Sequence, residues 1–174
     1  MRKFSVRDLT FAALVAALYA VMGYFANIFG WAFGQVQCRF AEALTVLPFV
    51  FPAAAPGLAV GCLITNLLSP YGPLDLIFGT LATATAAWLT IKMPKWYLAA
   101  LPPILVNALI LPAIWAWTDV GAVNDAFWLA YGYSALTFIP GEALVCYVLG
   151  TALLKALPQV DYLKPVMRQP ARQK

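Results

Sequence analysis

The feature that most constrains this chain is a series of long apolar stretches that carry almost no charge. They cover residues 9–29, 74–91, 96–117 and 126–154, and each is about as long as the 18 or more residues that a membrane-crossing helix needs. The 174-residue chain is 63% hydrophobic and only 10% charged, whereas a soluble domain carries about 25% charged residues. One soluble core cannot bury that much apolar surface. The sequence therefore predicts an all-α integral membrane protein.

Two shorter apolar stretches, residues 40–51 and 56–68, are broken by Pro48, Pro52 and Pro56. At about 1.5 Å per residue neither covers a ~30 Å hydrocarbon layer, so each must be tilted, sheltered by neighbours or partly re-entrant. With them included, residues 1–158 are predicted to form a six-transmembrane-helix bundle. Residues 159–174 are predicted to form a basic tail. The first stretch is interpreted as an uncleaved span, because it is long for a signal peptide.

The positive charges indicate the orientation of the bundle. Six spans place ten of the eleven Lys and Arg residues on one side, and only Arg39 on the other. Cytoplasmic loops are rich in Lys and Arg, so both termini are predicted to be cytoplasmic, in a cell membrane. The net charge of +4 is thereby explained as an orientation signal. Binding of anionic lipid is a secondary role, and a nucleic-acid partner is not expected.

Several catalytic and metal-binding patterns are missing. The chain has no histidine. Cys38, Cys62 and Cys146 are isolated, odd in number and without CxxC spacing, so we interpret them as packing residues instead of metal ligands or disulfide partners. It has no GxxxxGK[ST] phosphate loop, no HExxH and no GxSxG. We therefore expect no catalytic residues, no metal site, no cofactor and no enzyme activity.

Three polar residues lie deep within apolar stretches. Glu142 is near the middle of the last stretch, two residues after Pro140. A carboxylate at membrane depth costs a few kcal/mol and is a functional-site candidate by default. The alternative is a protonated Glu142 that hydrogen-bonds a neighbouring helix. Asn66 and Asn107 fit two roles equally, ligand contact or a structural hydrogen bond between helices.

Arg39, Glu42 and Asp75 are further candidates near the predicted outer face. Arg39 and Glu42 are three residues apart and could form an ion pair on one helix face. Asp75 follows a Ser-Pro-Tyr-Gly-Pro turn and could cap a helix instead of binding a ligand.

Small residues form a stripe on the first span. Ala12, Ala16 and Ala20 recur every four residues, with Ala13 and Ala17 beside them. Such a stripe allows close approach of another helix. That helix belongs either to this chain or to a separate membrane subunit.

Three polar-studded segments resemble a known family. They read RFAEALTVLP at residues 39–48, PGLAVGCLITNL at 56–67 and PLDLIFGTLAT at 73–83. These segments are similar to the queuosine-precursor transporter (QueT) family, and the likeness extends over most of the chain.

The resemblance implies the substrate-binding S component of an energy-coupling factor (ECF) importer. In such systems a six-helix membrane subunit captures a vitamin-like compound, while a transmembrane coupling (T) subunit and two ATPase subunits supply the energy. This division of labour agrees with the missing phosphate loop. It also assigns the stripe of Ala12, Ala13, Ala16, Ala17 and Ala20 to docking of the coupling subunit.

The resemblance further implies a queuosine precursor as cargo, 7-aminomethyl-7-deazaguanine or queuine. A deazaguanine offers paired N–H donors to a carboxylate, and its aminomethyl cation suits a second carboxylate. Aromatic side chains can stack on the ring. The expected substrate-binding residues are Glu142, Asp75, Glu42, Asn66, Asn107, Gln35, Gln37, Trp31, Tyr71 and Arg39, with Phe33 as a further aromatic.

Other functions remain open at this point. The chain could serve another vitamin-like cargo or act alone as a facilitator. It could also be an intramembrane enzyme that uses Glu142, or a structural subunit without a ligand.

Overall fold

The computed structural model describes residues 4–30 and 39–167. Within these ranges the chain is entirely helical and has no strand. Its α-helices are interrupted or extended by 3-10 and π segments, labelled η. The elements are α1 (Val6–Ile28), η1 (Phe40–Phe49), α2 (Ala54–Asn66), α3 (Gly72–Leu74), η2 (Asp75–Gly79), α4 (Thr80–Ile91), η3 (Trp96–Leu98), α5 (Leu101–Val120), α6 (Asp125–Leu144), η4 (Val145–Gly150), α7 (Thr151–Ala156), η5 (Leu157–Gln159) and η6 (Asp161–Val166).

Four of the continuous helical stretches are long and apolar enough to cross a membrane. They are Val6–Ile28, Gly72–Ile91, Trp96–Val120 and Asp125–Gln159. The helices Phe40–Phe49 and Ala54–Asn66 are apolar but shorter. The expectation of an all-α, multi-pass membrane protein is confirmed, and so are the two short segments. Six crossings of the bilayer remain a prediction.

Local sequence signals set several of the helix ends. Ser5 and Asp8 form a capping box at the start of α1, in which each side chain accepts a hydrogen bond from the other residue's backbone N–H. The Asn124 side chain accepts the Phe127 N–H at 3.0 Å and caps α6. Gly121 ends α5 with a φ of 73°, which only glycine adopts without strain. The connection from α5 to α6 covers only residues 121–124, and the two helices pack against each other.

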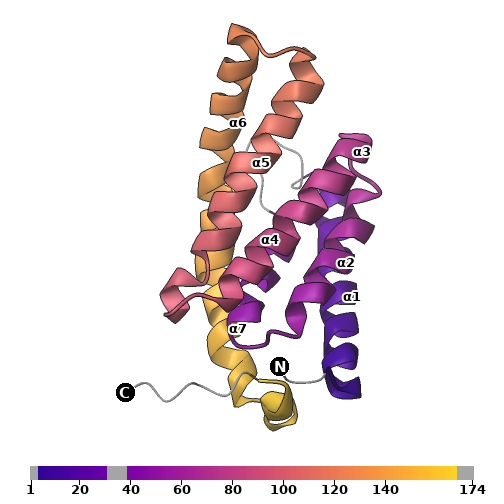
Figure 1. Cartoon of the computed structure of the whole chain (residues 1–174), viewed down its shortest axis with the longest axis vertical. Coiled ribbons are helices and arrows are strands. Elements are labelled where there is room, and N and C mark those ends of the chain that lie inside the picture. The colour runs from indigo at the N-terminus through magenta and orange to yellow at the C-terminus, as the bar shows by residue number, and fades with distance from the viewer. Residues whose placement is uncertain (1–3, 31–38, 168–174) are drawn as a thin grey trace.

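The helices form two pairs joined by a diagonal helix (Figure 1). Helix α1 packs on α2, α5 packs on α6, and α4 contacts both α2 and α5. The 3-10 segment η1 lies among them and contacts α1, α2, α4, α5, η4 and α7. Its residues from Ala41 to Pro48 are all buried. This central position makes η1 the segment that joins both halves of the bundle.

Part of the alanine stripe packs closely against α2. Ala12, Ala16 and Ala20 are buried, and a Cβ at Gly57 would come within 2.2 Å of the Ala12 carbonyl oxygen. A Cβ at Gly61 would lie 2.8 Å from the carbonyl oxygen of Ala16. These three alanines therefore lie on the face of α1 that packs on α2. Docking of another subunit through this row is untested.

The other two alanines remain available. Ala13 and Ala17 are exposed on an outer face of α1, beside Leu14 and Leu18. The docking role of this outer face stays a prediction.

Three lysines share one end of the molecule. Lys92 lies 3.2 Å from the centroid of the Trp88 ring, and the Lys155 ammonium lies 5.4 Å from that of Trp96. The second contact ties α7 to the start of the helix that contains α5, near Lys95. Figure 1 shows that α1 begins and α7 ends toward this same end. The clustering agrees with the charge pattern of the sequence, and the side of the membrane remains a prediction.

Helical structure continues beyond residue 158, where the basic tail was predicted to begin. Segment η6 packs against the core cluster that contains Phe11 and Phe51, through Leu163, Val166 and Met167. The first part of the predicted tail thus belongs to the packed bundle. The division at residues 158 and 159 is otherwise untested.

Candidate functional site

Ionisable and amide side chains gather inside the apolar bundle. All six predicted polar site residues within the described ranges are buried, and Asp75 and Glu142 have 0% of their surface exposed. Five different elements, or the residues that flank them, supply this set. The buried polar cluster consists of Arg39, Glu42, Asn66, Asp75, Asn107 and Glu142.

One half of the buried polar cluster contains two glutamates. The Tyr19 hydroxyl donates to Glu42 Oε1 at 2.5 Å, and Asn107 Nδ2 donates to Glu142 Oε1 at 3.0 Å. Cys146 lies one turn after Glu142, and its thiol donates to the Glu42 carbonyl oxygen at 3.6 Å. The Glu42 and Glu142 carboxylates are near enough for their charges to interact. Helices α1, α5 and α6 thus meet η1 at two neighbouring carboxylates.

The other half is centred on Asp75. The Ser69 hydroxyl donates to Asp75 Oδ2 at 2.7 Å, and Asn66 Nδ2 donates to the Asp75 carbonyl oxygen at 3.0 Å. Arg39 Nη2 in turn donates to Asn66 Oδ1 at 3.4 Å. Gly79 leaves room for this arrangement, because a Cβ there would lie 2.7 Å from Asn66 Nδ2 and would force that side chain to move.

These contacts correct two expectations. Asp75 does not cap a helix N-terminus, since Tyr71 occupies that position and the Asp75 carboxylate accepts from a serine side chain. Arg39 does not pair with Glu42, because its guanidinium is directed to Asn66. Lys164–Asp161 is the ion pair found within the described residues.

Both halves of the buried polar cluster lie at or near irregular helical turns. Asp75 opens the π segment η2, and Glu142 lies three residues before the π segment η4. A π turn shifts the backbone hydrogen-bonding pattern by one residue, is rare, and frequently occurs at functional sites. Pro140 lies within α6 just before Glu142 and cannot donate a backbone hydrogen bond.

Several buried polar atoms have no hydrogen-bond partner within the described part of the chain. Four are acceptors: Glu42 Oε2, Asp75 Oδ1, Asn107 Oδ1 and Glu142 Oε2. The fifth is a donor, Trp115 Nε1. Leaving such an atom unpaired costs about 1–3 kcal/mol. The cluster is therefore arranged to accept several hydrogen bonds from a partner that the fold does not supply.

The formal charges favour the same kind of partner. Arg39 carries one positive charge beside the carboxylates of Glu42 and Asp75, and Glu142 adds a third carboxylate. Carboxyl groups thus outnumber the cation within the cluster. A buried carboxylate is costly unless it is paired. A donor-rich, cationic ligand would relieve that cost.

Comparison with known sequences places the chain in a family. The sequence profile described as QueT transporter matches residues 9–159. The chain belongs to the QueT transporter family. This is a family of transporters and not of enzymes, in agreement with the expectation for this chain.

A curated relative is similar over part of the sequence. The protein named queuosine precursor transporter QueT from Lactococcus lactis subsp. cremoris (strain MG1363) is 31% identical over 83 residues. The aligned part is 48% of this chain and 48% of the relative. The match therefore spans about half the length of the curated relative. No solved structure matches the chain significantly.

Sequence reasoning missed three residues of the site in this QueT-family chain. Tyr19 and Ser69 donate to two of the carboxylates, and Trp115 lies on the face of α5 that carries Asn107. The spacing of Asn107 and Trp115, eight residues apart, was the one available signal.

Tyr71 belongs to an aromatic group beside the buried polar cluster. The Trp115 ring is 5.6 Å from the Tyr71 ring and 5.6 Å from the Phe138 ring, between centroids. Burial, helped by the charges of Asp119 and Asp75, raises the pKa of the Tyr71 phenol above its ordinary value. Its hydroxyl therefore stays neutral at physiological pH.

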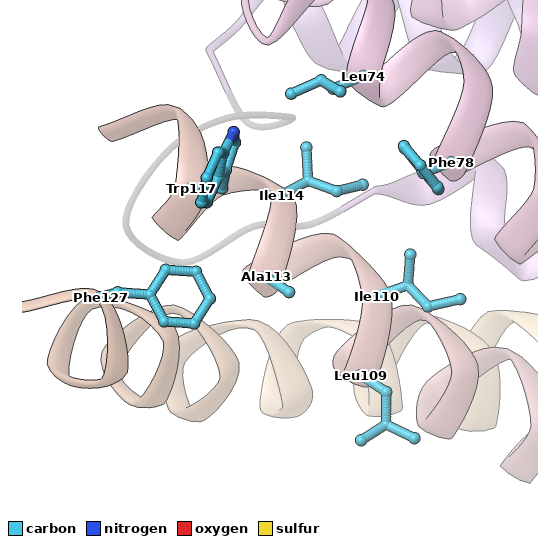
Figure 2. A pocket seen from close by; sticks show the side chains of 8 residues that line it. All are labelled: Leu74, Phe78, Leu109, Ile110, Ala113, Ile114, Trp117 and Phe127. Atoms are coloured by element: carbon cyan, nitrogen blue, oxygen red, sulfur yellow. The ribbon is translucent and has the colours of Figure 1, made fainter. Parts of the chain in front are cut away.

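A groove of about 470 Å³ lies elsewhere, between η2, α5 and α6 (Figure 2). Its lining is apolar and contains no member of the buried polar cluster. Several lining side chains, such as Leu109 and Phe78, are exposed on the outer surface. An apolar, exposed lining suits contact with lipid and offers no group to bind a polar ligand, so we do not assign the candidate site to this groove. The lining residues are Leu74, Phe78, Leu109, Ile110, Ala113, Ile114, Trp117 and Phe127.

Some predicted residues cannot be placed. Trp31, Phe33, Gln35, Gln37 and Cys38 lie outside the described residues. Cys62 and Cys146 are free and buried. Across residues 4–30 and 39–167, no group of three or more His, Cys, Asp or Glu residues is suited to hold a metal ion.

Proposed function

We propose that this chain is the membrane subunit that captures a queuosine precursor from outside the cell. The cargo is 7-aminomethyl-7-deazaguanine or queuine, and a separate energy-coupling module drives its import with ATP. The observation that carries the proposal is a set of four buried acceptor atoms that have no partner among residues 4–30 and 39–167. Membership of the QueT transporter family and the name of the Lactococcus lactis relative support it.

The cargo and the buried polar cluster are chemically complementary. A deazaguanine has N–H donors at N1 and at the exocyclic amine, which one carboxylate accepts as a pair. Glu142 is the residue we assign to this pair. Its Oε2 is unpaired within the described residues, and Oε1, which accepts from Asn107 Nδ2 at 3.0 Å, has a second lone pair for the other donor. The aminomethyl group is a cation, and we assign it to the carboxylates of Asp75 and Glu42. Arg39 and Asn66 then position Asp75, because Arg39 donates to Asn66 and Asn66 donates to the Asp75 carbonyl oxygen.

A purely structural role for Glu142 fits the geometry less well. A structural glutamic acid would use both oxygens within the bundle, or its buried polar group would reduce stability. Only Oε1 of Glu142 has a partner in the described chain, and Oε2 has none. The free oxygen favours ligand contact over a bridge between helices.

The proposed partners are a transmembrane coupling subunit and two ATPase subunits. A second small-residue row supports an external docking face, because Ala13 and Ala17 are four residues apart and exposed. Small side chains let another helix approach closely within the bilayer. The exposed face of α1 is thus the proposed contact with the coupling subunit, in place of the buried row.

A ligand screen tests the proposed function. The purified chain is incubated in detergent or nanodiscs with 7-aminomethyl-7-deazaguanine, queuine, guanine and common vitamins, and its thermal unfolding is recorded. We expect stabilisation by the deazaguanines, since a ligand that binds only the folded state raises its stability. Recovery of the compound unchanged excludes turnover. Stabilisation by another vitamin alone, or by no compound, would contradict the proposal.

A further inference from the structure

Trp115 carries a buried hydrogen-bond donor that no other described residue accepts. Its side chain is 3% exposed, and its Nε1 has no partner within the described residues. The four other unpaired buried side-chain atoms are all acceptors. An indole N–H can only donate. A ligand that satisfies the whole set must therefore present several donors and at least one acceptor.

Trp115 contacts residues of the segments that carry Asp75 and Glu142. It lies on the same face of α5 as Asn107, about 12 Å further along the helix. Helical side chains lean toward the N-terminus, so the indole is directed back toward Asn107. Its ring packs against Phe138, one turn before Glu142, and against Tyr71, in the turn that leads to Asp75. The indole thus lies between the two segments that carry these carboxylates.

A guanine-type base has the matching arrangement of groups. Its 6-oxo group is an acceptor bonded to the ring carbon next to N1, and N1–H and the 2-amino group are donors. A carboxylate that binds the N1 and 2-amino donors therefore has the 6-oxo oxygen beside it. A second protein group must donate to that oxygen, because burying it unpaired weakens binding. Among the unpaired atoms, Trp115 Nε1 alone has this capacity.

We propose that the indole N–H of Trp115 donates to the 6-oxo group of the cargo and thereby selects 6-oxo-7-deazapurines. This inference rests on the proposed function, and it adds a specificity-determining residue to it. It holds whichever carboxylate takes the N1 edge, since the 6-oxo oxygen is adjacent to N1 in either case. Tyr71 and Phe138 keep the indole in place through their ring contacts.

The test compares two ligands that differ at one atom. The probes are 7-aminomethyl-7-deazaguanine and its 6-thio counterpart, which keeps N1–H and the 2-amino group but has a weaker acceptor at position 6. Dissociation constants are measured for the wild-type chain and for Trp115→Phe. We expect the wild type to prefer the 6-oxo compound and Trp115→Phe to lose about tenfold in affinity for it, with a smaller loss for the 6-thio compound. The ratio of the two constants should therefore fall toward one.

Two further variants separate the hydrogen bond from packing. Replacement of Trp115 by benzothienylalanine keeps the shape of the ring and removes only the N–H donor. It should reproduce the change in ratio. Trp117→Phe is the matched control, because Trp117 is on the same helix but is 45% exposed and lines the apolar groove. It should leave both constants unchanged.

The outcomes distinguish this inference from the proposed function. If the wild type binds 7-aminomethyl-7-deazaguanine but the benzothienylalanine variant keeps the wild-type ratio, Trp115 does not read the 6-oxo group and this inference alone is overturned. If the wild type binds neither compound, the proposed function is overturned and the inference with it.

Discussion

Each carboxylate of the buried polar cluster has one oxygen held by the protein and one oxygen without a partner in the described chain. Asp75 is held by Ser69, Glu42 by Tyr19 and Glu142 by Asn107. A side chain fixed at one oxygen keeps its other oxygen in a defined direction. The three residues are thus preorganised for hydrogen-bond donors, although their environments differ. Asp75 and Glu42 also lie near the charge of Arg39.

The division of labour among these carboxylates is testable with a neutral analogue. Asp75→Asn and Glu42→Gln should weaken binding of 7-aminomethyl-7-deazaguanine by about 30-fold or more, the loss expected for a buried charged partner. Binding of 7-methyl-7-deazaguanine, which lacks the cationic amine, should change little. Isotherms of both variants with both ligands provide the measurement.

The control for this pair is Asp125→Asn, at an exposed aspartate in the first turn of α6. It should bind both ligands like the wild type. Equal losses for the two ligands in Asp75→Asn and Glu42→Gln would place these side chains away from the amine.

The sequence revealed the isolated polar residues but not their aromatic partners. Glu142, Asn107 and Asn66 stand out because polar groups within apolar stretches are costly and rare. Tyr19 and Trp115 do not stand out, because aromatic residues with a polar atom are common in membrane proteins, both in cores and at interfaces. Only their contacts in the folded bundle identify them.

At the level of single helices, α1 has two faces that resemble each other in the sequence. Ala12, Ala16 and Ala20 face α2, whereas Ala13 and Ala17 face outward. Both rows have the four-residue spacing that allows close helix packing. Rows one residue apart differ by about 100° around the helix, and composition alone does not say which one faces inward. The glycines at 57 and 61 are the complementary signal on α2.

This difference predicts opposite behaviour for two adjacent alanines. Ala17→Trp should leave folding and cargo binding near wild type but abolish co-purification with the coupling subunits. Ala16→Trp should instead lower thermal stability, because its ring would have to displace α2, and overpacking costs about 1–3 kcal/mol or more. Pull-down of the coupling subunits and thermal unfolding of each variant are the measurements.

Retained co-purification of Ala17→Trp would contradict docking through the outer face. A stable Ala16→Trp variant would contradict the packing of α1 on α2.

The π segments were beyond sequence prediction. Nothing in residues 75–79 or 145–150 distinguishes a π turn from an ordinary helical turn, since hydrophobic periodicity changes by only one residue. The 3-10 geometry of η1 was likewise not predicted. The sequence predicted only that this apolar segment is too short to span the bilayer comfortably. Tertiary packing around the buried polar cluster, and not local propensity, selects these forms.

On the scale of the whole molecule, charge and topology agree. The α4–α5 connection, which contains Lys92 and Lys95, and helix α7, which contains Lys155, lie toward the end where α1 begins, and the α5–α6 connection lies at the other end (Figure 1). Cation–π contacts with Trp88, Tyr97 and Trp96 are typical of an interface between membrane and water. The positive end is predicted to be cytoplasmic.

Labelling of single cysteines tests this orientation. In a chain without its native cysteines, Lys95→Cys should react with an impermeant reagent only from the cytoplasmic side. Val123→Cys, at an exposed position in the α5–α6 connection, should react only from outside. Reaction of both from the same side would refute the topology.

The central claim is that the buried polar cluster binds the cargo through Glu142. The most direct measurement is titration of the wild-type chain and of Glu142→Gln with 7-aminomethyl-7-deazaguanine, with thermal unfolding as the check on folding. The amide keeps the size of the side chain but removes the charge and replaces one acceptor by a donor. We predict that Glu142→Gln remains folded and loses about 30-fold to several thousand-fold in affinity. Wild-type affinity in Glu142→Gln would show that Glu142 is a structural residue and would contradict the assignment of the site.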